Sequence, residues 1–154
     1  MYMAYDALSD AMKSMIEGLK AIHTGERSYG ASNSQVTLRQ SQFSRSMDVQ
    51  VKDDAVSEIA HPLVRTHPET GRKSLFVDQS YLSRIEGLPK EESRFLLSFL
   101  ASRVNDVSIQ CRFQWTRGAV GVWDERSTQH AGSADHRGQA RSLRRCTIEG
   151  EAPI

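Results

Sequence analysis

The stretch from Trp115 to Ile148 constrains the fold of this chain more than any other. It contains two short runs of β-forming residues, a Thr-Gln-His end, a turn-rich connection and a last strand-like run that carries Arg141 and Arg145. Side chains alternate between the two faces of a strand, so two arginines four residues apart point the same way. A buried guanidinium is costly unless a carboxylate, phosphate or sulfonate pairs with it. The pattern therefore predicts an anion-binding face.

His130 lies at the end of the run that precedes this connection. A neutral imidazole can supply one nitrogen to a metal in the same cavity, but one histidine does not hold a catalytic metal by itself. His67-Pro68-Glu69 is the only His-x-acid spacing in the chain. We interpret it as a turn rather than a metal pair, because Pro68 removes a strand hydrogen-bond donor and Thr-Gly follows.

Length and composition favour a single soluble domain. The 154 residues carry a formal net charge of +1, which gives no electrostatic reason to expect nucleic acid or an anionic membrane as partner. The chain shows neither an apolar run of membrane-spanning length nor a signal-peptide pattern, so we expect a cytoplasmic protein. Cys111 and Cys146 are expected to be small, half-buried side chains rather than a disulfide or a zinc pair.

Two segments with different periodicity open the chain. Residues 1–23 have apolar side chains at helical spacing, and Ser9 with Asp10 offers an N-cap that would divide the run into two helices. Residues 25–46 are polar and rich in glycine and serine, which predicts a mobile loop. That loop is either an active-site lid or a plain linker.

The remainder of the chain predicts a helix between short strands. Residues 63–66 and 74–77 predict two strands about a turn. Residues 89–104 predict the clearest helix, with an apolar stripe that packs on a sheet and comprises Phe95, Leu96, Phe99, Leu100 and Val104. Residues 109–115 and 119–124 then predict strands joined by a Thr-Arg-Gly turn. This order is typical of the C-terminal part of a β-barrel or jelly roll.

Taken together, these blocks resemble the taurine catabolism dioxygenase (TauD/TfdA) family of iron(II)- and 2-oxoglutarate-dependent oxygenases. The matching pieces are AYDALSD, HPLVRTHPETGRKSLFV, the RIEGL…ES…LLSFL helix, FQWTRGAVGVWDERSTQH and an R-x-x-x-R run followed by TIEGEAP. The resemblance implies an α+β, mainly β fold over residues 1–154. This would be a partial double-stranded β-helix, or jelly roll, with flanking helices and without the N-terminal portion of the family domain.

The resemblance also implies roles for four residues. His130 would be the distal iron ligand, and Arg141 would bind the distal carboxylate of 2-oxoglutarate. Arg145 would bind the substrate's anionic group or help to hold the cosubstrate. Phe76 would lie close to the substrate pocket. The implied substrate is a small organic anion with a sulfonate, sulfate ester or carboxylate group, and the sequence leaves its identity open.

The chain departs from the family in its iron ligands. The proximal His-x-Asp pair of the family lies upstream of the block that matches AYDALSD, so this sequence contains no counterpart, and we expect little turnover from the chain alone. Asp124, Asp135 and His136 are disfavoured as substitutes: the spacing of Asp124 does not force it to meet His130, and His136 belongs to the connecting turn, where we expect it to be exposed. Smaller departures replace common family residues by Arg117, Glu125, Ala131 and His136.

Other interpretations remain open from the sequence. One alternative is an inactive fragment that arises from an internal start, a frameshift or gene decay, and another is a half-protein that pairs with a separately encoded N-terminal half. Strand edges left unpaired by such a truncation would favour self-association. A generic alternative treats a set of four arginines as a basic surface strand without a ligand: Arg137, Arg141, Arg144 and Arg145.

Overall fold

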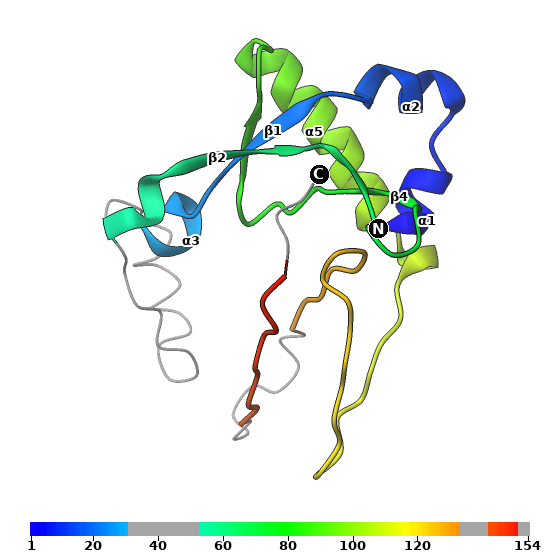
Figure 1. Cartoon of the computed structure of the whole chain (residues 1–154), viewed down its shortest axis with the longest axis vertical. Helices are drawn as coiled ribbons and strands as arrows, with labels where there is room; N and C mark the ends of the chain where they lie inside the picture. Colours follow the sequence, from blue (N-terminus) through cyan, green and yellow to red (C-terminus); the bar gives the residue numbers. More distant parts are fainter. Residues whose placement is uncertain (31–52, 133–141, 151–154) are drawn as a thin grey trace.

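The computed structural model describes residues 1–30, 53–132 and 142–150 (Figure 1). Its helices are α1 (Tyr2–Asp6), α2 (Asp10–Ile16), α3 (Glu26–Tyr29) and α5 (Lys90–Val104), with short 3-10 helices η1 (Asp53–Val56) and η2 (Val107–Ile109). Its strands are β1 (Lys20–Thr24), β2 (Glu58–Pro62), β3 (Val64–Thr66), β4 (Lys73–Leu75) and β5 (Leu82–Ile85). Among the described residues, none of the helices combines the length and apolar character needed to cross a membrane.

The N-terminal segment is only partly helical. Ser9 divides it as predicted, since its Oγ accepts a hydrogen bond of 3.2 Å from the Met12 N–H at the start of α2. The helical prediction is wrong beyond Ile16. Gly18 has a φ of +82°, a conformation that glycine adopts without steric cost, and the chain leaves the helix there to enter β1.

Two small antiparallel sheets follow from the strand pairing. One has the order β2-β1-β5 and the other pairs β3 with β4. The two strands predicted at 63–66 and 74–77 are confirmed as a hairpin, in which Val64 faces Leu75 and Thr66 faces Lys73. Of residues 25–46, the expected loop, 31–46 lie outside the described residues, and 26–29 form α3.

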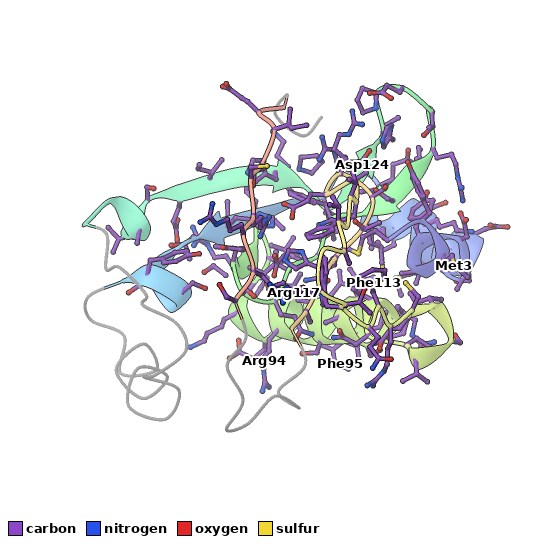
Figure 2. All side chains as sticks on the ribbon, turned by 90° about the horizontal axis from the view of Figure 1, so that it is seen from below. Met3, Arg94, Phe95, Phe113, Arg117 and Asp124 are labelled. Carbon is purple, nitrogen blue, oxygen red and sulfur yellow. The ribbon has the colours of Figure 1, made fainter. Side chains whose placement is uncertain are left out.

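The core lies between these sheets and α5. Leu75 of β4, Ile85 of β5 and Leu63, which lies between β2 and β3, are fully buried in one core cluster with Leu100 of the helix. The predicted helix is confirmed, but its stripe is narrower than expected. Phe95 is 79% exposed on the outer side of α5 (Figure 2).

The strands predicted after α5 are not present among the described residues. The Thr-Arg-Gly turn does form, with the Ala119 N–H donating to the Thr116 carbonyl at 3.0 Å. The extended segment before this turn runs away from both sheets and the one after it returns toward the β3–β4 hairpin (Figure 1), but neither joins a strand ladder among the described residues. Apolar side chains on them are consequently exposed, including Phe113, Val120 and Val122, and also Ile148 in the last described segment.

The unpaired extended segments bear on two further expectations, the burial of the cysteines and the partial jelly roll. Cys111 and Cys146 are free as predicted, but both are exposed rather than half-buried because their segments are unpaired. The described residues show mixed helices and antiparallel sheets. The partial jelly roll therefore remains a proposal.

Candidate functional site

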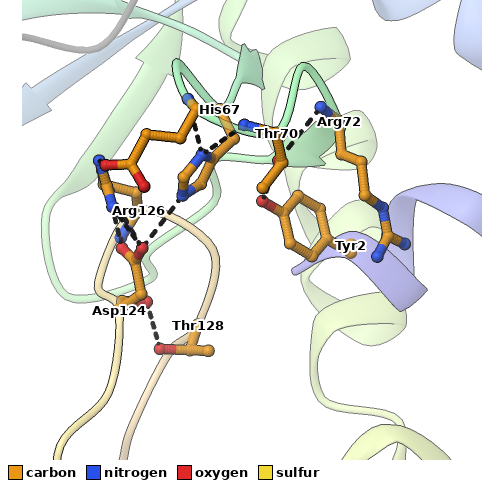
Figure 3. A network of polar contacts seen from close by, with 8 residues as sticks. Tyr2, His67, Thr70, Arg72, Asp124, Arg126 and Thr128 are labelled. Carbon is orange, nitrogen blue, oxygen red and sulfur yellow. Dashed lines mark hydrogen bonds and ion pairs between the residues drawn. The ribbon is translucent and has the colours of Figure 1, made fainter.

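His67 lies at the centre of a polar network between two turns (Figure 3). It follows β3 directly and is 4% exposed. Its Nδ1 accepts from the backbone N–H groups of Glu69 and Thr70, at 3.2 and 3.3 Å. The ring proton of the neutral imidazole is therefore on Nε2, which donates to Asp124 Oδ2 at 3.0 Å. The interpretation of residues 67–70 as a turn is confirmed, and His67 has no nitrogen left for a metal.

Asp124 and Arg126 form the charged part of the same network. Arg126 donates from Nε to Oδ1 at 2.9 Å and from Nη2 to Oδ2 at 2.7 Å, and its Nη1 bonds Glu69 at 2.9 Å. These bonds from Arg126, and then the bond from His67, hold the pKa of the Asp124 carboxyl well below its usual range. The carboxylates of Asp124 and Glu69 raise the pKa of Arg126 in turn.

This network fixes the turn that leads to His130. The Thr128 Oγ1 donates to the Asp124 carbonyl at 2.6 Å, which closes the turn two residues before His130. The turn is thereby attached to the β3–β4 hairpin, although the hairpin lies far away in the sequence. Sequence reasoning treated Asp124 only as a weak substitute ligand and missed this structural role.

His130 and Arg145, two of the predicted site residues, lie close together. Arg145 Nη1 lies 3.4 Å from His130 Nε2. Because a guanidinium only donates, Nε2 accepts and the ring proton is on Nδ1, 3.5 Å from Glu125 Oε1. Glu125 also forms an ion pair with Arg145 and accepts from Trp123 Nε1 at 3.2 Å. The Glu125 carboxylate thus contacts both His130 and Arg145.

The strand face predicted for the two arginines is not observed. Arg141 lies outside the described residues, so its place beside Arg145 stays a prediction. Arg145 itself belongs to an extended segment without an assigned strand. Arg145 lies close enough to Tyr81, the residue before β5, for its charge to lower the pKa of Tyr81, whereas the hydrogen bond between Tyr81 and Tyr29 raises that pKa to about 12.

The described residues do not fit an iron centre by themselves. No group of three or more His, Cys, Asp or Glu side chains in the described ranges is arranged to hold a metal ion. His130 Nε2 faces Arg145 and its Nδ1 faces Glu125, so this imidazole would have to leave Arg145 to bind a metal, and Asp124 is occupied by His67 and Arg126. A facial iron site needs two histidines and a carboxylate, and the described residues do not bring such a set together.

Phe76, the predicted pocket residue, lies in an aromatic cluster at the end of β4. Its ring centroid is 5.2 Å from that of His23 and 5.6 Å from that of His61. The guanidinium carbon of Arg65 lies 5.8 Å from the centre of the same ring. Sequence reasoning missed these three neighbours, because they come from β1, β2 and β3 and only the strand pairing brings them together.

A profile of the family described as "Taurine catabolism dioxygenase TauD, TfdA family" matches residues 1–147. The chain belongs to this family. An alkylsulfatase of Acinetobacter baylyi is 36% identical over 148 residues, which cover 96% of this chain and 45% of that protein. An alpha-ketoglutarate-dependent 2,4-dichlorophenoxyacetate dioxygenase of Cupriavidus pinatubonensis is 34% identical over 151 residues, 98% of this chain and 48% of its own length.

Solved structures of similar proteins match part of this fold. The structure of AAD-2 in complex with Mn(II) and N-oxalylglycine matches 75% of this chain and 41% of its own, with 28% identity and a TM-score of 0.56. This TauD/TfdA chain spans less than half the length of these relatives. The family profile covers His130 and Arg145, so both residues lie within the part of the chain that matches the family.

Proposed function

We propose that this chain forms part of an iron- and 2-oxoglutarate-dependent dioxygenase that acts on a small organic anion. The proximity of His130 and Arg145 carries the proposal, since an imidazole that could bind a metal after releasing Arg145 lies beside an anion-binding guanidinium. The named relatives support the substrate class, because they include a sulfatase and a dioxygenase of an aryloxyacetate. The anionic group would be a sulfonate, a sulfate ester or a carboxylate.

Each predicted residue has one task in this proposal. His130 supplies one iron ligand, with its orientation set by the turn that His67 and Asp124 hold. Arg141 binds the distal carboxylate of 2-oxoglutarate. Arg145 binds the anionic group of the substrate or helps to hold the cosubstrate, and Phe76 lines the pocket.

The remaining iron ligands would come from sequence that these 154 residues do not contain. The extended segments on either side of the turn at residues 116–118 support this, because they expose apolar side chains and unpaired backbone groups. Strands that paired with them would complete the jelly roll and cover those side chains. Pairing with a separately encoded half, or with a second copy, would use the same edges.

A chimera tests the proposal. This chain would be joined to the part of the Acinetobacter baylyi alkylsulfatase that it does not match, and iron-dependent formation of succinate from 2-oxoglutarate would be measured with an alkyl sulfate. We expect succinate from the chimera, its loss in His130→Ala and its retention in the neighbouring control Gln129→Ala. Iron-dependent succinate formation that survives His130→Ala would contradict the proposal.

A further inference from the structure

Arg65 is a buried cation without an ion-pair partner among the described residues. It lies in the middle of β3 and is 6% exposed. Its Nε finds no hydrogen-bond acceptor in the described part of the chain. The nearest charges that act on it are Arg126, which is repulsive, and Asp124, whose carboxylate already accepts from Arg126 and His67.

A second unpaired polar group faces the same way. Ser74 pairs directly with Arg65 across the hairpin, and residues opposite each other in an antiparallel pair project from the same face with Cβ atoms about 5 Å apart. Ser74 is fully buried and its Oγ also finds no partner among the described residues. Two buried hydrogen-bond donors, Arg65 Nε and Ser74 Oγ, therefore lie on one side of the hairpin without an acceptor among the described residues.

Leaving these groups unpaired is costly. A buried donor without an acceptor costs about 1–3 kcal/mol, and more when it is charged. Proteins place an anion beside a buried guanidinium because the fork of N–H groups meets two oxygens at once. Arg65 and Ser74 thus offer two hydrogen-bond donors from which the oxygens of an anion could accept.

The surroundings of Arg65 are aromatic and reach the surface. The ring of Phe76 lies under the guanidinium, and His23 and His61 pack against that ring. These three side chains are only partly buried, so the group opens to solvent on their side. The His23 Nδ1 donates to the Ala21 carbonyl at 3.2 Å, and burial lowers the pKa of both histidines, so their rings are neutral and Arg65 is the cation of the group.

We propose that Arg65, Ser74 and Phe76 form a binding site for a small organic anion. The sulfonate, sulfate or carboxylate group would accept from Arg65 Nε and Ser74 Oγ, and the apolar part of the ligand would lie on the Phe76 ring. The site shares Phe76 with the proposed substrate pocket, but its cation is Arg65 rather than Arg145, and it requires no iron. It goes beyond the proposed function because neither Arg65 nor Ser74 is among the residues implied to bind an anion.

Titration of the 154-residue chain with butanesulfonate and with inorganic sulfate tests the site. Binding would be followed by calorimetry and by the NMR signal of the Arg65 Nε–H. We expect a shift of that signal and a butanesulfonate affinity about 15- to 60-fold above that of sulfate, since two or three buried methylene groups contribute about this much. Phe76→Leu should reduce the preference for butanesulfonate while sulfate binding persists.

Arginine variants give the matched comparison. Arg65→Met should weaken butanesulfonate binding by about tenfold or more, as expected for a charge-assisted bond. Arg84→Met is the control, since Arg84 is exposed and pairs with Glu58 on the other sheet. Arg65→Lys keeps the charge but not the planar fork, and it serves if the methionine variant does not fold.

Three results would overturn the inference. A folded Arg65→Met chain that binds butanesulfonate with unchanged affinity would do so. Loss of binding in Arg145→Met with retention in Arg65→Met would place the anion at Arg145, which would support the proposed function and reject this site. Failure of the wild-type chain to bind either anion would indicate that Arg65 instead receives a carboxylate from another protein segment.

Discussion

His67 Nε2 donates to Asp124 Oδ2 at 3.0 Å across a sequence separation of 57 residues. This bond joins the turn of the β3–β4 hairpin to the turn that precedes His130 (Figure 3). Both histidine nitrogens are used, one toward the backbone and one toward the carboxylate. The position of His130 is therefore determined by a residue that belongs to a different part of the fold.

Replacement of His67 should destabilise the chain strongly. His67→Ala leaves the N–H groups of Glu69 and Thr70 without their acceptor and removes a donor from Asp124, so we expect a loss of about 2 kcal/mol or more in the free energy of unfolding. Urea unfolding of the chain measures it. Arg94→Ala, on the exposed side of α5, is the control and should change stability by less than about 0.5 kcal/mol. Equal effects of the two substitutions would refute the structural role of His67.

The Asp124 carboxylate should make stability depend on acid pH. Its pKa is lower in the folded chain than in the unfolded chain, because Arg126 and His67 donate to the charged form. Its stabilising contribution is therefore present above the unfolded pKa, near 3.9, and is lost as the pH falls through the lower folded value. The difference in unfolding free energy between wild type and Asp124→Asn should shrink as the pH falls below about 4. Stability curves that stay parallel down to the acid limit would contradict this.

Glu125 should compete with external anions for Arg145. Its carboxylate forms an ion pair with Arg145, so Glu125→Gln would release the guanidinium. We expect the affinity of the chain for 2-oxoglutarate to rise about two- to fivefold, the range of an exposed ion pair. Isothermal titration measures the change, and Glu149→Gln, an exposed residue of the same last segment, is the control. An unchanged affinity in Glu125→Gln would mean that Glu125 does not occupy the anion position.

The sequence alone predicts the elements whose ends carry strong local signals. Pro89 and the two glutamates after it mark the start of α5, and the Pro-Glu-Thr-Gly turn marks the hairpin. β1 was misread because its alternation is short and follows a helix, so its pairing with β2 and β5 decides its conformation. The runs after α5 have β-forming residues, but β propensity does not form a strand without a ladder partner.

In the candidate site, too, residues in short motifs can be predicted from the sequence, whereas residues brought together by strand pairing cannot. His130 and Arg145 could be singled out from the sequence because they belong to short family motifs. The burial of Arg65 could not, because an arginine two residues before His67 is unremarkable until Ser74 is placed opposite it. Residues whose roles depend on the register of two strands are invisible to any argument that follows the chain in one dimension.

Ser93 should anchor α5 to the sheet through one buried hydrogen bond. Its Oγ accepts from the Ile85 N–H at 2.7 Å, and Ser93 is 2% exposed. Ser93→Ala leaves that N–H buried without an acceptor, which costs about 1–3 kcal/mol and outweighs the gain in helix propensity of about 0.5 kcal/mol. Ser98→Ala is the matched control, because Ser98 is exposed on the same helix and only the propensity gain applies. Thermal or urea unfolding should therefore show opposite signs for the two substitutions, and stabilisation by both would show that the Ile85 N–H finds another acceptor.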